Sequence, residues 1–166
     1  ALKCGVTPQE IREALPNFKG VVRRFNVNAV SDAGVYVDDY AHHPEEIKAT
    51  INVAREVWPN SKLTIIFQPH LYTRTRDLYV DFAKSLSQAD KVILTEIYPA
   101  RELPIEGITS EIILDRLSCE KVLVEKANLM TYLDANFDGG VLITVGAGNI
   151  DQLIPHITLW MKSRKA

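Results

Sequence analysis

Two acids, a tyrosine and two histidines stand together in the sequence DDYAHHP at residues 38–44. An exposed tyrosine ring can stack on a nucleotide base, and a carboxylate can accept hydrogen bonds from ribose hydroxyls. The segment also suits an ordinary helix start, in which Asp38 or Asp39 caps backbone N–H groups and Pro44 takes the first helical position. On the residues alone, both interpretations stay open.

The adjacent histidines of this segment raise the question of a metal site. Two neighbouring residues of a regular element cannot easily bind one ion together, and no third ligand lies at a suitable spacing. We therefore expect no metal site among these residues.

A second polar segment, FQPHLYTRTRD at residues 67–77, combines two arginines, a histidine, a tyrosine and two threonines. Guanidinium groups beside the N-terminus of a helix can bind a carboxylate or a phosphate. The structural alternative is that Thr75 caps the helix and Arg76 pairs with a nearby acid. Two cations at a helix start oppose the helix dipole, so stability alone does not favour them. The pattern therefore favours a functional role for at least one arginine.

Two further segments look structural. The sequence YPARELPIEG at residues 98–107 holds two prolines and a glycine, which predict an ordered surface connector. The sequence GAGN at residues 146–149 predicts a tight turn from a strand into a helix rather than a phosphate site. The chain has no GxxxxGK[ST] sequence, so it lacks the usual P-loop for a nucleoside triphosphate.

Strands and helices must position these segments, and hydrophobic spacing predicts both kinds of element. Apolar residues at i, i+4, i+7 and i+11 mark one helical face, while short apolar runs mark strands. The predicted helices are 7–15, 44–58, 77–86, 110–117, 128–136 and 150–161, and the predicted strands are 27–30, 35–38, 63–67, 91–97, 121–125 and 141–145. The first two strands flank a turn sequence, which predicts a hairpin.

The alternation of short apolar strands with amphipathic helices predicts an α/β fold. We expect a mostly parallel sheet of about six strands with helices on both faces. Ligands of such sheets bind beyond the carboxyl ends of the strands. The segments that follow Asp38, Phe67, Ile97 and Val145 are therefore where a site is expected.

The composition fits one ordinary globular domain, because 46% of the 166 residues are hydrophobic and 24% are charged. The net charge of −2 does not suggest a nucleic-acid partner. No apolar run approaches the roughly 20 residues that a membrane helix needs, so no membrane partner is expected. Cys4 and Cys119 lie far apart, which predicts no disulfide framework and fits a reducing cytosol.

The first residues predict that the chain is a piece of a longer protein. Residues 2–5 look like the end of a helix with Gly5 as its C-cap, and the chain starts with neither Met nor a signal peptide. We expect a short tail of an upstream domain at this end.

Taken together, five segments make the chain similar to the Mur ligase family, the amino-acid ligases of peptidoglycan synthesis. The matching sequences are FKGVVRRF at 18–25, DDYAHHPEEI at 38–47, FQPHLYTRTRD at 67–77, EIYPARELPIEG at 96–107 and VGAGNI at 145–150. They resemble most of all the C-terminal domain of the members that join L-alanine to UDP-N-acetylmuramate. The resemblance implies a Rossmann-like C-terminal ligase domain at 26–166, preceded at 1–25 by the tail of the central ATPase domain and a connector.

The chemistry that the resemblance implies is ATP-dependent ligation in the bacterial cytoplasm. The carboxylate of UDP-N-acetylmuramate attacks the γ-phosphate of ATP, and the amine of L-alanine displaces phosphate from the acyl phosphate. ATP and Mg²⁺ would be held mainly by the missing central domain. This chain would pack on the N-terminal and central domains, close over ATP and the amino acid, and be inactive alone.

The resemblance also implies roles at the first polar segment. Arg24 would reach the phosphates of ATP from the connector. Asp39, Tyr40, His42 and His43 would bind the adenosine or line the cleft between domains. No residue of the chain is expected to be catalytic.

At the second polar segment, the resemblance implies the amino-acid site. His70 and Arg74 would hold the substrate and its carboxylate, because a planar guanidinium bonds a carboxylate at two points. Tyr72 and Arg76 belong to the same implied site. Many relatives have arginine where this chain has Leu71. If that arginine contacts the carboxylate of the amino acid, the contact is absent here or is made by Arg76.

Two alternatives fit part of the sequence. The AHHP sequence at residues 41–44 also suits the related murein tripeptide recycling ligase, although FQPHLYTRTRD favours the alanine-adding members. A stand-alone nucleotide-binding module would bind ATP at micromolar concentration without another domain. We expect no detectable ATP binding by the isolated chain, because the phosphate-binding loop is missing.

Overall fold

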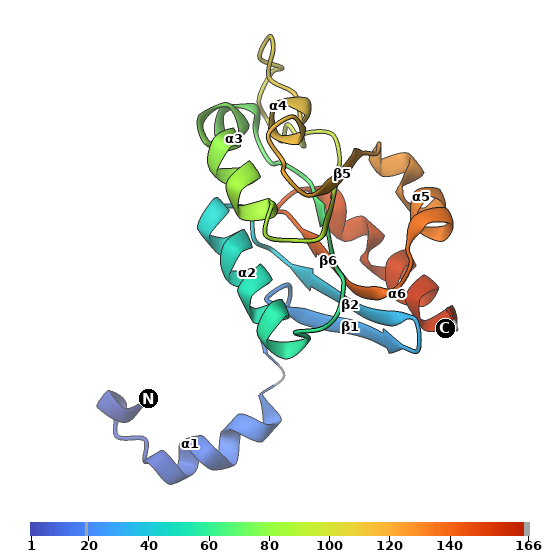
Figure 1. The fold of residues 1–166 in the computed structure, drawn as a ribbon. Coiled ribbons are helices and arrows are strands. Elements are labelled where there is room, and N and C mark those ends of the chain that lie inside the picture. Colours follow the sequence, from blue (N-terminus) through green and yellow to red (C-terminus); the bar gives the residue numbers. More distant parts are fainter. Residues whose placement is uncertain (19, 165–166) are drawn as a thin grey trace.

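The computed structural model describes residues 1–18 and 20–164, and a single sheet with helices on both faces begins at residue 26 (Figure 1). The strands are β1 (Asn26–Ser31), β2 (Gly34–Asp39), β3 (Leu63–Phe67), β4 (Lys91–Leu94), β5 (Glu120–Leu123) and β6 (Gly140–Val145). The α-helices are α1 (Pro8–Ala14), α2 (Pro44–Val57), α3 (Tyr72–Leu86), α4 (Glu111–Leu114), α5 (Leu129–Asn136) and α6 (Ile154–Ser163). Short 3₁₀ helices are η1 (Leu2–Cys4), η2 (Leu15–Asn17), η3 (Lys126–Asn128) and η4 (Asn149–Leu153).

The strands lie in the order β1-β2-β6-β3-β4-β5. β1 pairs antiparallel with β2, and every other pairing is parallel. The predicted α/β fold is therefore confirmed, and so is the hairpin. Because β6 lies between β2 and β3, the loops that follow these three strands meet at the same edge of the sheet. We call this the carboxyl edge, and the opposite one the amino edge.

The central strands alternate their side chains between two cores. In β3, Ile65 and Phe67 face the core that includes Ile47 of α2, whereas Ile66 faces the core that includes Ile157 of α6. Figure 1 shows α2 and α3 on one face of the sheet and α5 and α6 on the other. Burial on both faces explains why the central strands β3 and β6 are almost entirely apolar.

Residues 1–18 extend away from the sheet (Figure 1). α1 begins with a capping box between Thr7 and Glu10, as the sequence predicts. None of the residues in η1, α1 or η2 is buried, and Leu15 and Phe18 are 59% and 64% exposed. The first residues therefore present uncovered apolar side chains.

α3 begins earlier than predicted, at Tyr72. The preceding residue, Leu71, adopts a left-handed backbone conformation with φ of 73°, which turns the chain abruptly into the helix. The hydroxyl of Thr75 donates to the carbonyl of Leu71 at 2.8 Å, so Thr75 lies in the first turn and does not cap the helix. The structural alternative was therefore wrong about Thr75, and Arg74 and Arg76 lie on the helix itself.

Other boundaries differ by a few residues. β4 and α4 are shorter than predicted, and the last predicted helix is divided into η4 and α6. The hydroxyl of Ser110 donates to the carbonyl of Thr95 at 2.6 Å, which ties the long loop after β4 to the sheet. Within the described part of the chain, none of the helices has the length and apolarity needed to cross a membrane.

Candidate functional site

The loops after β3 and β6 are fastened together at the carboxyl edge. Gln68 is buried directly after β3, donates its side-chain amide to Asn149 at 3.0 Å and accepts the N–H of Ile150 at 2.9 Å. A Cβ atom at Gly148 would lie 2.5 Å from the Gln68 side-chain oxygen and 2.7 Å from Cβ of Tyr98. Only glycine fits there, and the tight turn predicted after β6 is confirmed.

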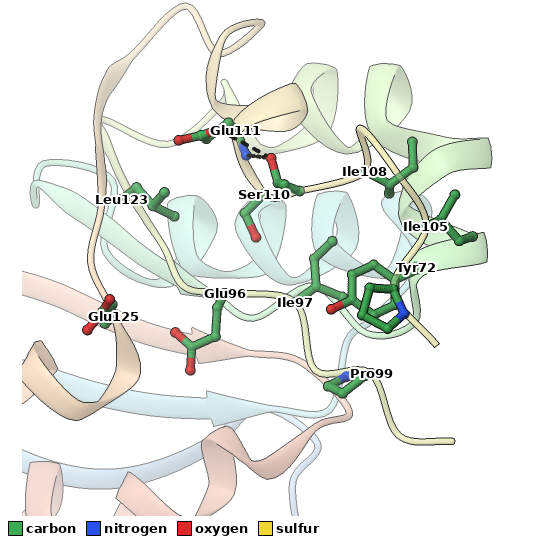
Figure 2. A pocket seen from close by; sticks show the side chains of 12 residues that line it. Tyr72, Glu96, Ile97, Pro99, Ile105, Ile108, Ser110, Glu111, Leu123 and Glu125 are labelled. Carbon is green, nitrogen blue, oxygen red and sulfur yellow. Dashed lines mark hydrogen bonds between the residues drawn. The ribbon is translucent and has the colours of Figure 1, made fainter. Parts of the chain in front are cut away.

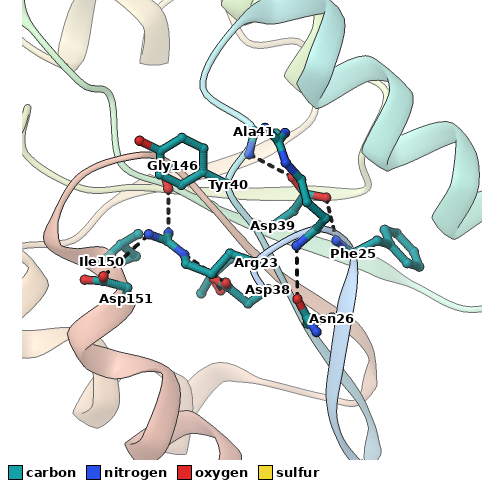
Figure 3. A network of polar contacts seen from close by, with 12 residues as sticks. Arg23, Phe25, Asn26, Asp38, Asp39, Tyr40, Ala41, Gly146, Ile150 and Asp151 are labelled. Atoms are coloured by element: carbon teal, nitrogen blue, oxygen red, sulfur yellow. Dashed lines mark hydrogen bonds and ion pairs between the residues drawn. The ribbon is translucent and has the colours of Figure 1, made fainter. Parts of the chain in front are cut away.

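Arg23 joins three segments of the carboxyl edge through one guanidinium, as Figure 3 shows. Nε lies 3.2 Å from Oδ2 of Asp38 at the end of β2, Nη2 donates to the carbonyl of Gly146 at 2.7 Å, and Nη1 lies 3.5 Å from Asp151. Asp38 is 1% exposed and accepts the hydroxyl of Thr144 at 2.8 Å. Burial raises the pKa of Asp38, while the Thr144 hydrogen bond and the charge of Arg23 oppose that rise.

The sequence did not single out Arg23. An arginine pair in a connector does not reveal which member turns toward the domain. The only signal in the sequence was that Asp38 and Asp39 of the DDYAHHP segment could form an ion pair with one of the two arginines.

The ring of Tyr40 lies among cationic and imidazole groups. The exposed Arg24, predicted to reach phosphates, has its guanidinium carbon 5.7 Å from the ring centre, and that of Arg23 is 5.0 Å away. The imidazole of His42 meets the ring edge-on at 5.1 Å. A half-buried aromatic face beside an exposed guanidinium suits a ligand with a planar ring and an anionic group.

Asp39 is buried and holds the connector against the loop. Its Oδ2 accepts the N–H of Phe25 and its Oδ1 accepts the N–H of Ala41, both at 2.8 Å. The interpretation of Asp39 as a helix cap is therefore wrong. His43 occupies the N-cap position of α2, and Pro44 takes the first turn as predicted.

The two histidines of this loop have different surroundings. His42 is half-buried, with Nδ1 3.0 Å from the carbonyl of Tyr40 and 3.3 Å from Glu46, whereas His43 is exposed. The N–H groups of His42 and His43 donate to the same Glu46 oxygen at 2.9 and 3.2 Å. Burial alone would raise the pKa of Glu46, but these hydrogen bonds and the charge of His42 lower it on balance. Glu46, which the sequence analysis missed, fixes the shape of the loop.

His70 and Arg74 come together as predicted for the amino-acid site. Nη1 of Arg74 lies 3.3 Å from Nδ1 of His70. Because a guanidinium can only donate, Nδ1 accepts and the neutral imidazole carries its proton on Nε2. The ring of Tyr98 stacks on the imidazole at 5.7 Å. Burial first, and then the charges of Arg74 and His42, lower the pKa of His70.

The loop at 98–107 is more than the surface connector predicted from the sequence. Glu102 accepts the N–H of Thr73 at 2.9 Å and its hydroxyl at 2.5 Å, and these hydrogen bonds lower the pKa of Glu102. The N–H of Leu71 donates to the carbonyl of Tyr98 at 3.0 Å. The loop therefore anchors the first turn of α3. Its prolines indicated an ordered loop but not these contacts.

Tyr72 and Arg76, predicted for the same substrate site, lie elsewhere. Arg76 pairs with Asp77 at 2.7 Å, which confirms the structural alternative for this side chain. Tyr72 lines a separate pocket of about 590 Å³ between the loop at 98–107 and the end of β5 (Figure 2). The structure therefore does not bring these two side chains to His70.

Two cations of the candidate site, Arg24 and Arg74, have no acidic partner among the residues that the structure describes. Among residues 1–18 and 20–164, no carboxylate lies within ion-pair distance of Arg24 or Arg74. The same part of the chain holds no group of three or more His, Cys, Asp and Glu side chains arranged for a metal ion. An anion from a ligand or from another part of the protein can reach both arginines.

Residues 23–148 match the family described as Mur ligase, glutamate ligase domain. The chain belongs to the Mur ligase family. A UDP-N-acetylmuramate–L-alanine ligase of Phocaeicola vulgatus is 50% identical over 155 residues, which are 92% of this chain and 34% of that protein. The chain thus spans about a third of the length of the curated Mur ligases that it matches.

Solved structures of the Mur ligase family share the fold. The UDP-N-acetylmuramate–alanine ligase of Thermotoga maritima superimposes with a TM-score of 0.75 at 32% identity, over 98% of this chain and 35% of that one. A murein peptide ligase of Psychrobacter arcticus gives 0.70 at 18% identity, over 99% and 35%. The Rossmann-like C-terminal fold implied by the sequence is therefore confirmed.

Proposed function

We propose that this chain is the C-terminal part of an ATP-dependent ligase that joins L-alanine to UDP-N-acetylmuramate in bacterial peptidoglycan synthesis. The observation that carries the proposal is Arg74, which contacts His70 at the carboxyl edge and has no acidic partner in the described residues. Identities of 46% to 50% with proteins named as alanine-adding ligases support the same substrate.

In this proposal, His70 and Arg74 hold the carboxylate of L-alanine. Arg74 keeps guanidinium donors beyond its contact with His70. The neutral imidazole of His70 accepts that contact at Nδ1 and keeps one donor, Nε2–H. Leu71 supplies a backbone turn into α3 and no polar group. Arg76 is bonded to Asp77 and does not replace the arginine found there in many relatives.

The loop after β2 faces ATP in the same proposal. Arg24 neutralises phosphate charge, and the ring of Tyr40 stacks beside the adenosine, with His42 and His43 at its margin. Asp39 already accepts two backbone N–H groups, so it shapes the loop and has lone pairs left for a ribose hydroxyl. These side chains come from a connector and a loop that the buried Asp39 holds together.

Mg²⁺ would enter with the nucleotide in this account. Magnesium usually keeps several waters and binds through one or two carboxylates plus substrate phosphates. Asp39 and Glu46 line one pocket with Arg24, and both already accept hydrogen bonds from backbone N–H groups. We therefore assign the ion mainly to residues outside this chain. When bound, the ion neutralises charge on the phosphates during transfer.

We further propose that residues 1–25 are the tail of a central ATPase domain plus a connector, and that 26–166 form the closing domain. The family match begins at residue 23, and the uncovered Leu15 and Phe18 fit a surface that packs on another domain. Dependence on ATP and two free cysteines fit the bacterial cytosol.

The test uses the full-length protein with ATP, UDP-N-acetylmuramate and one of two amines. With L-alanine, we expect phosphate release and a product whose mass has grown by one alanyl residue. With the murein tripeptide L-alanyl-γ-D-glutamyl-diaminopimelate, we expect little product. Exclusive use of the tripeptide would support the recycling ligase instead.

The stand-alone binding module has its own test. Calorimetry of the 166-residue chain with ATP should give no measurable heat, because the chain has no P-loop sequence. A clear micromolar isotherm would favour the module over the closing domain.

A further inference from the structure

Two adjacent arginines of the connector lie beside the ring of Tyr40 but differ in their other contacts. The side chain of Arg23 is 16% exposed and contacts Asp38, Gly146 and Asp151 at the carboxyl edge. The side chain of Arg24 is exposed and lies over the ring of Tyr40. One arginine is thus bonded inside the domain, while its neighbour faces the outside.

The bonds of Arg23 lead into a buried polar chain. Asp38 accepts the hydroxyl of Thr144 at 2.8 Å, and the Thr144 oxygen accepts the hydroxyl of Tyr36 at 2.9 Å. Asp38 and Thr144 are register partners on the neighbouring strands β2 and β6. A buried carboxylate without its cation is strongly unfavourable, so Asp38 holds the guanidinium of Arg23 in place.

The backbone around Arg24 is fixed on both sides. Arg23 and Phe25 have φ values of 59° and 50°, a left-handed conformation that costs free energy for residues other than glycine. The carbonyl of Arg23 accepts the N–H of Tyr40 at 2.8 Å, and the N–H of Phe25 donates to Asp39 at 2.8 Å. Such strained residues persist only where their surroundings hold them.

We propose that Arg23 is a positioning residue for the nucleotide side of the site. Its ion pair with Asp38 fastens residues 23–25 to the carboxyl edge and so sets the direction of Arg24 and the placement of Tyr40. The proposal rests on the proposed function only in naming ATP as the ligand. The fastening itself concerns this chain alone.

The kinetic test compares Arg23→Ala, Arg24→Ala and the double variant in the full-length ligase. Since Arg23 acts through Arg24 and Tyr40, we expect Arg23→Ala to raise the KM for ATP about 10-fold and leave the KM for L-alanine within about twofold. The double variant should show no larger KM for ATP than the worse single variant. Arg23→Lys should recover only part of the loss, because an ammonium cannot bond Asp38, Gly146 and Asp151 together.

Arg55→Ala is the matched control. Arg55 is also partly buried and bonds one carboxylate, Asp90, together with the carbonyls of Ser61 and Gln88, but at the amino edge. We expect Arg55→Ala to lower the Tm and leave both KM values unchanged. If Arg23→Ala behaves in the same way, Arg23 is only structural and the proposal is overturned.

The proposal would also be overturned if the effects of Arg23→Ala and Arg24→Ala on the KM for ATP were fully additive in the double variant. Arg23 would then contact the nucleotide itself. Arg23→Ala leaves Asp38 as an uncompensated buried charge. If that variant does not fold, Arg23→Ala combined with Asp38→Asn removes the charge and carries the same kinetic expectation.

Hydrogen exchange separates this proposal from the proposed function. In the 166-residue chain, Arg23→Ala combined with Asp38→Asn should speed amide exchange of Tyr40 and Phe25 at least about 10-fold. The exchange rate of the Leu63 amide, which donates to Asp90, should not change. Arg55→Ala should speed amide exchange of Leu63 and leave that of Tyr40 and Phe25 unchanged. Unchanged exchange at Tyr40 and Phe25 would refute the fastening, even if the enzyme uses ATP. Absence of ATP use with faster exchange would refute the proposed function and leave the fastening intact.

Discussion

At the amino edge of the sheet, the three basic side chains at the starts of β3 and β4 and the end of α2 each contact a carboxylate. Each partner is the first residue of a strand or lies within two residues before it, so each pair joins two neighbouring segments. The pairs are Arg55–Asp90 at 3.0 Å, Lys62–Asp138 at 2.9 Å and Lys91–Glu120 at 2.7 Å.

At the carboxyl edge, the basic side chains of the candidate site have other neighbours. Arg24 lies over an aromatic ring, and Arg74 contacts a neutral imidazole. In the described part of the chain neither contacts an acid. Arg23 is the exception at this edge, since it is paired with the buried Asp38.

The comparison separates structural charges from charges available to a ligand. Exposed ion pairs contribute little stability, and they leave no charge for a substrate. Unpaired cations near a helix start are unfavourable until an anion arrives. Arg24 and Arg74 are therefore the side chains that we propose for binding anionic ligands. The amino edge provides matched positions where the same substitution should not affect catalysis.

The largest expected effect follows from Arg74→Ala in the full-length ligase. Loss of a charged, two-point contact with the alanine carboxylate should lower kcat/KM for L-alanine about 10²-fold. Steady-state kinetics with varied alanine measures it. Arg55→Ala is the control at the other edge, and equal losses in the two variants would remove the distinction between the edges.

A smaller effect is expected for Tyr40→Ala. Loss of one stacked aromatic surface should raise the KM for ATP about 10-fold, while the KM for L-alanine changes little. Tyr40→Phe keeps the ring and should stay close to the parent enzyme. An effect confined to alanine would mean that the two loops have exchanged roles.

At the amino edge, Arg55→Ala should destabilise the domain by about 1 kcal/mol at neutral pH without a kinetic effect. The hydrogen bond from Arg55 is the main cause that lowers the pKa of Asp90. A carboxyl with a lowered pKa in the folded state stabilises the protein above its unfolded pKa, near 4, and loses that contribution as pH falls below it. Urea unfolding should thus show a larger difference between parent and variant at pH 7 than at pH 3.

The smallest effect concerns His70, whose pKa is lowered mainly by burial. The unfolded state binds a proton near pH 6.5 and the folded state at lower pH, so stability is complete above 6.5 and falls as pH drops through that region. His70→Gln can still accept a hydrogen bond from Arg74 but cannot titrate. Between pH 7.5 and 5.5, the Tm of the parent should fall more steeply with decreasing pH than the Tm of His70→Gln. Identical slopes of Tm against pH would argue against a neutral His70.

Much of the fold follows from local pattern. The apolar runs of β3 and β6 predict strands buried on both faces, and the rule that ligands bind beyond carboxyl ends selects the loops that hold Tyr40 and His70. The contact between His70 and Arg74 is also within reach of sequence, because the two residues are close along the chain. The main helices and strands, and the contact between His70 and Arg74, could therefore be predicted, whereas the site itself stays a prediction.

The rest depends on backbone conformations that no pattern reveals. The left-handed φ of Leu71 starts α3 early and moves Arg74 and Arg76 onto a helix. The left-handed φ of Arg23 decides which arginine of the pair turns inward. Glu102 contacts Thr73 across a long loop, and such pairings depend on tertiary structure.

The most direct measurement is a crystal structure of the full-length ligase with UDP-N-acetylmuramate, a non-hydrolysable ATP analogue and L-alanine. We expect the alanine carboxylate within hydrogen-bonding distance of Arg74 and His70, nucleotide phosphates beside Arg24, and Arg55 still paired with Asp90. If an acidic side chain of another domain pairs with Arg74 and the alanine binds elsewhere, the unpaired cations serve domain packing, and the assignment of the carboxyl edge to anionic substrates is wrong.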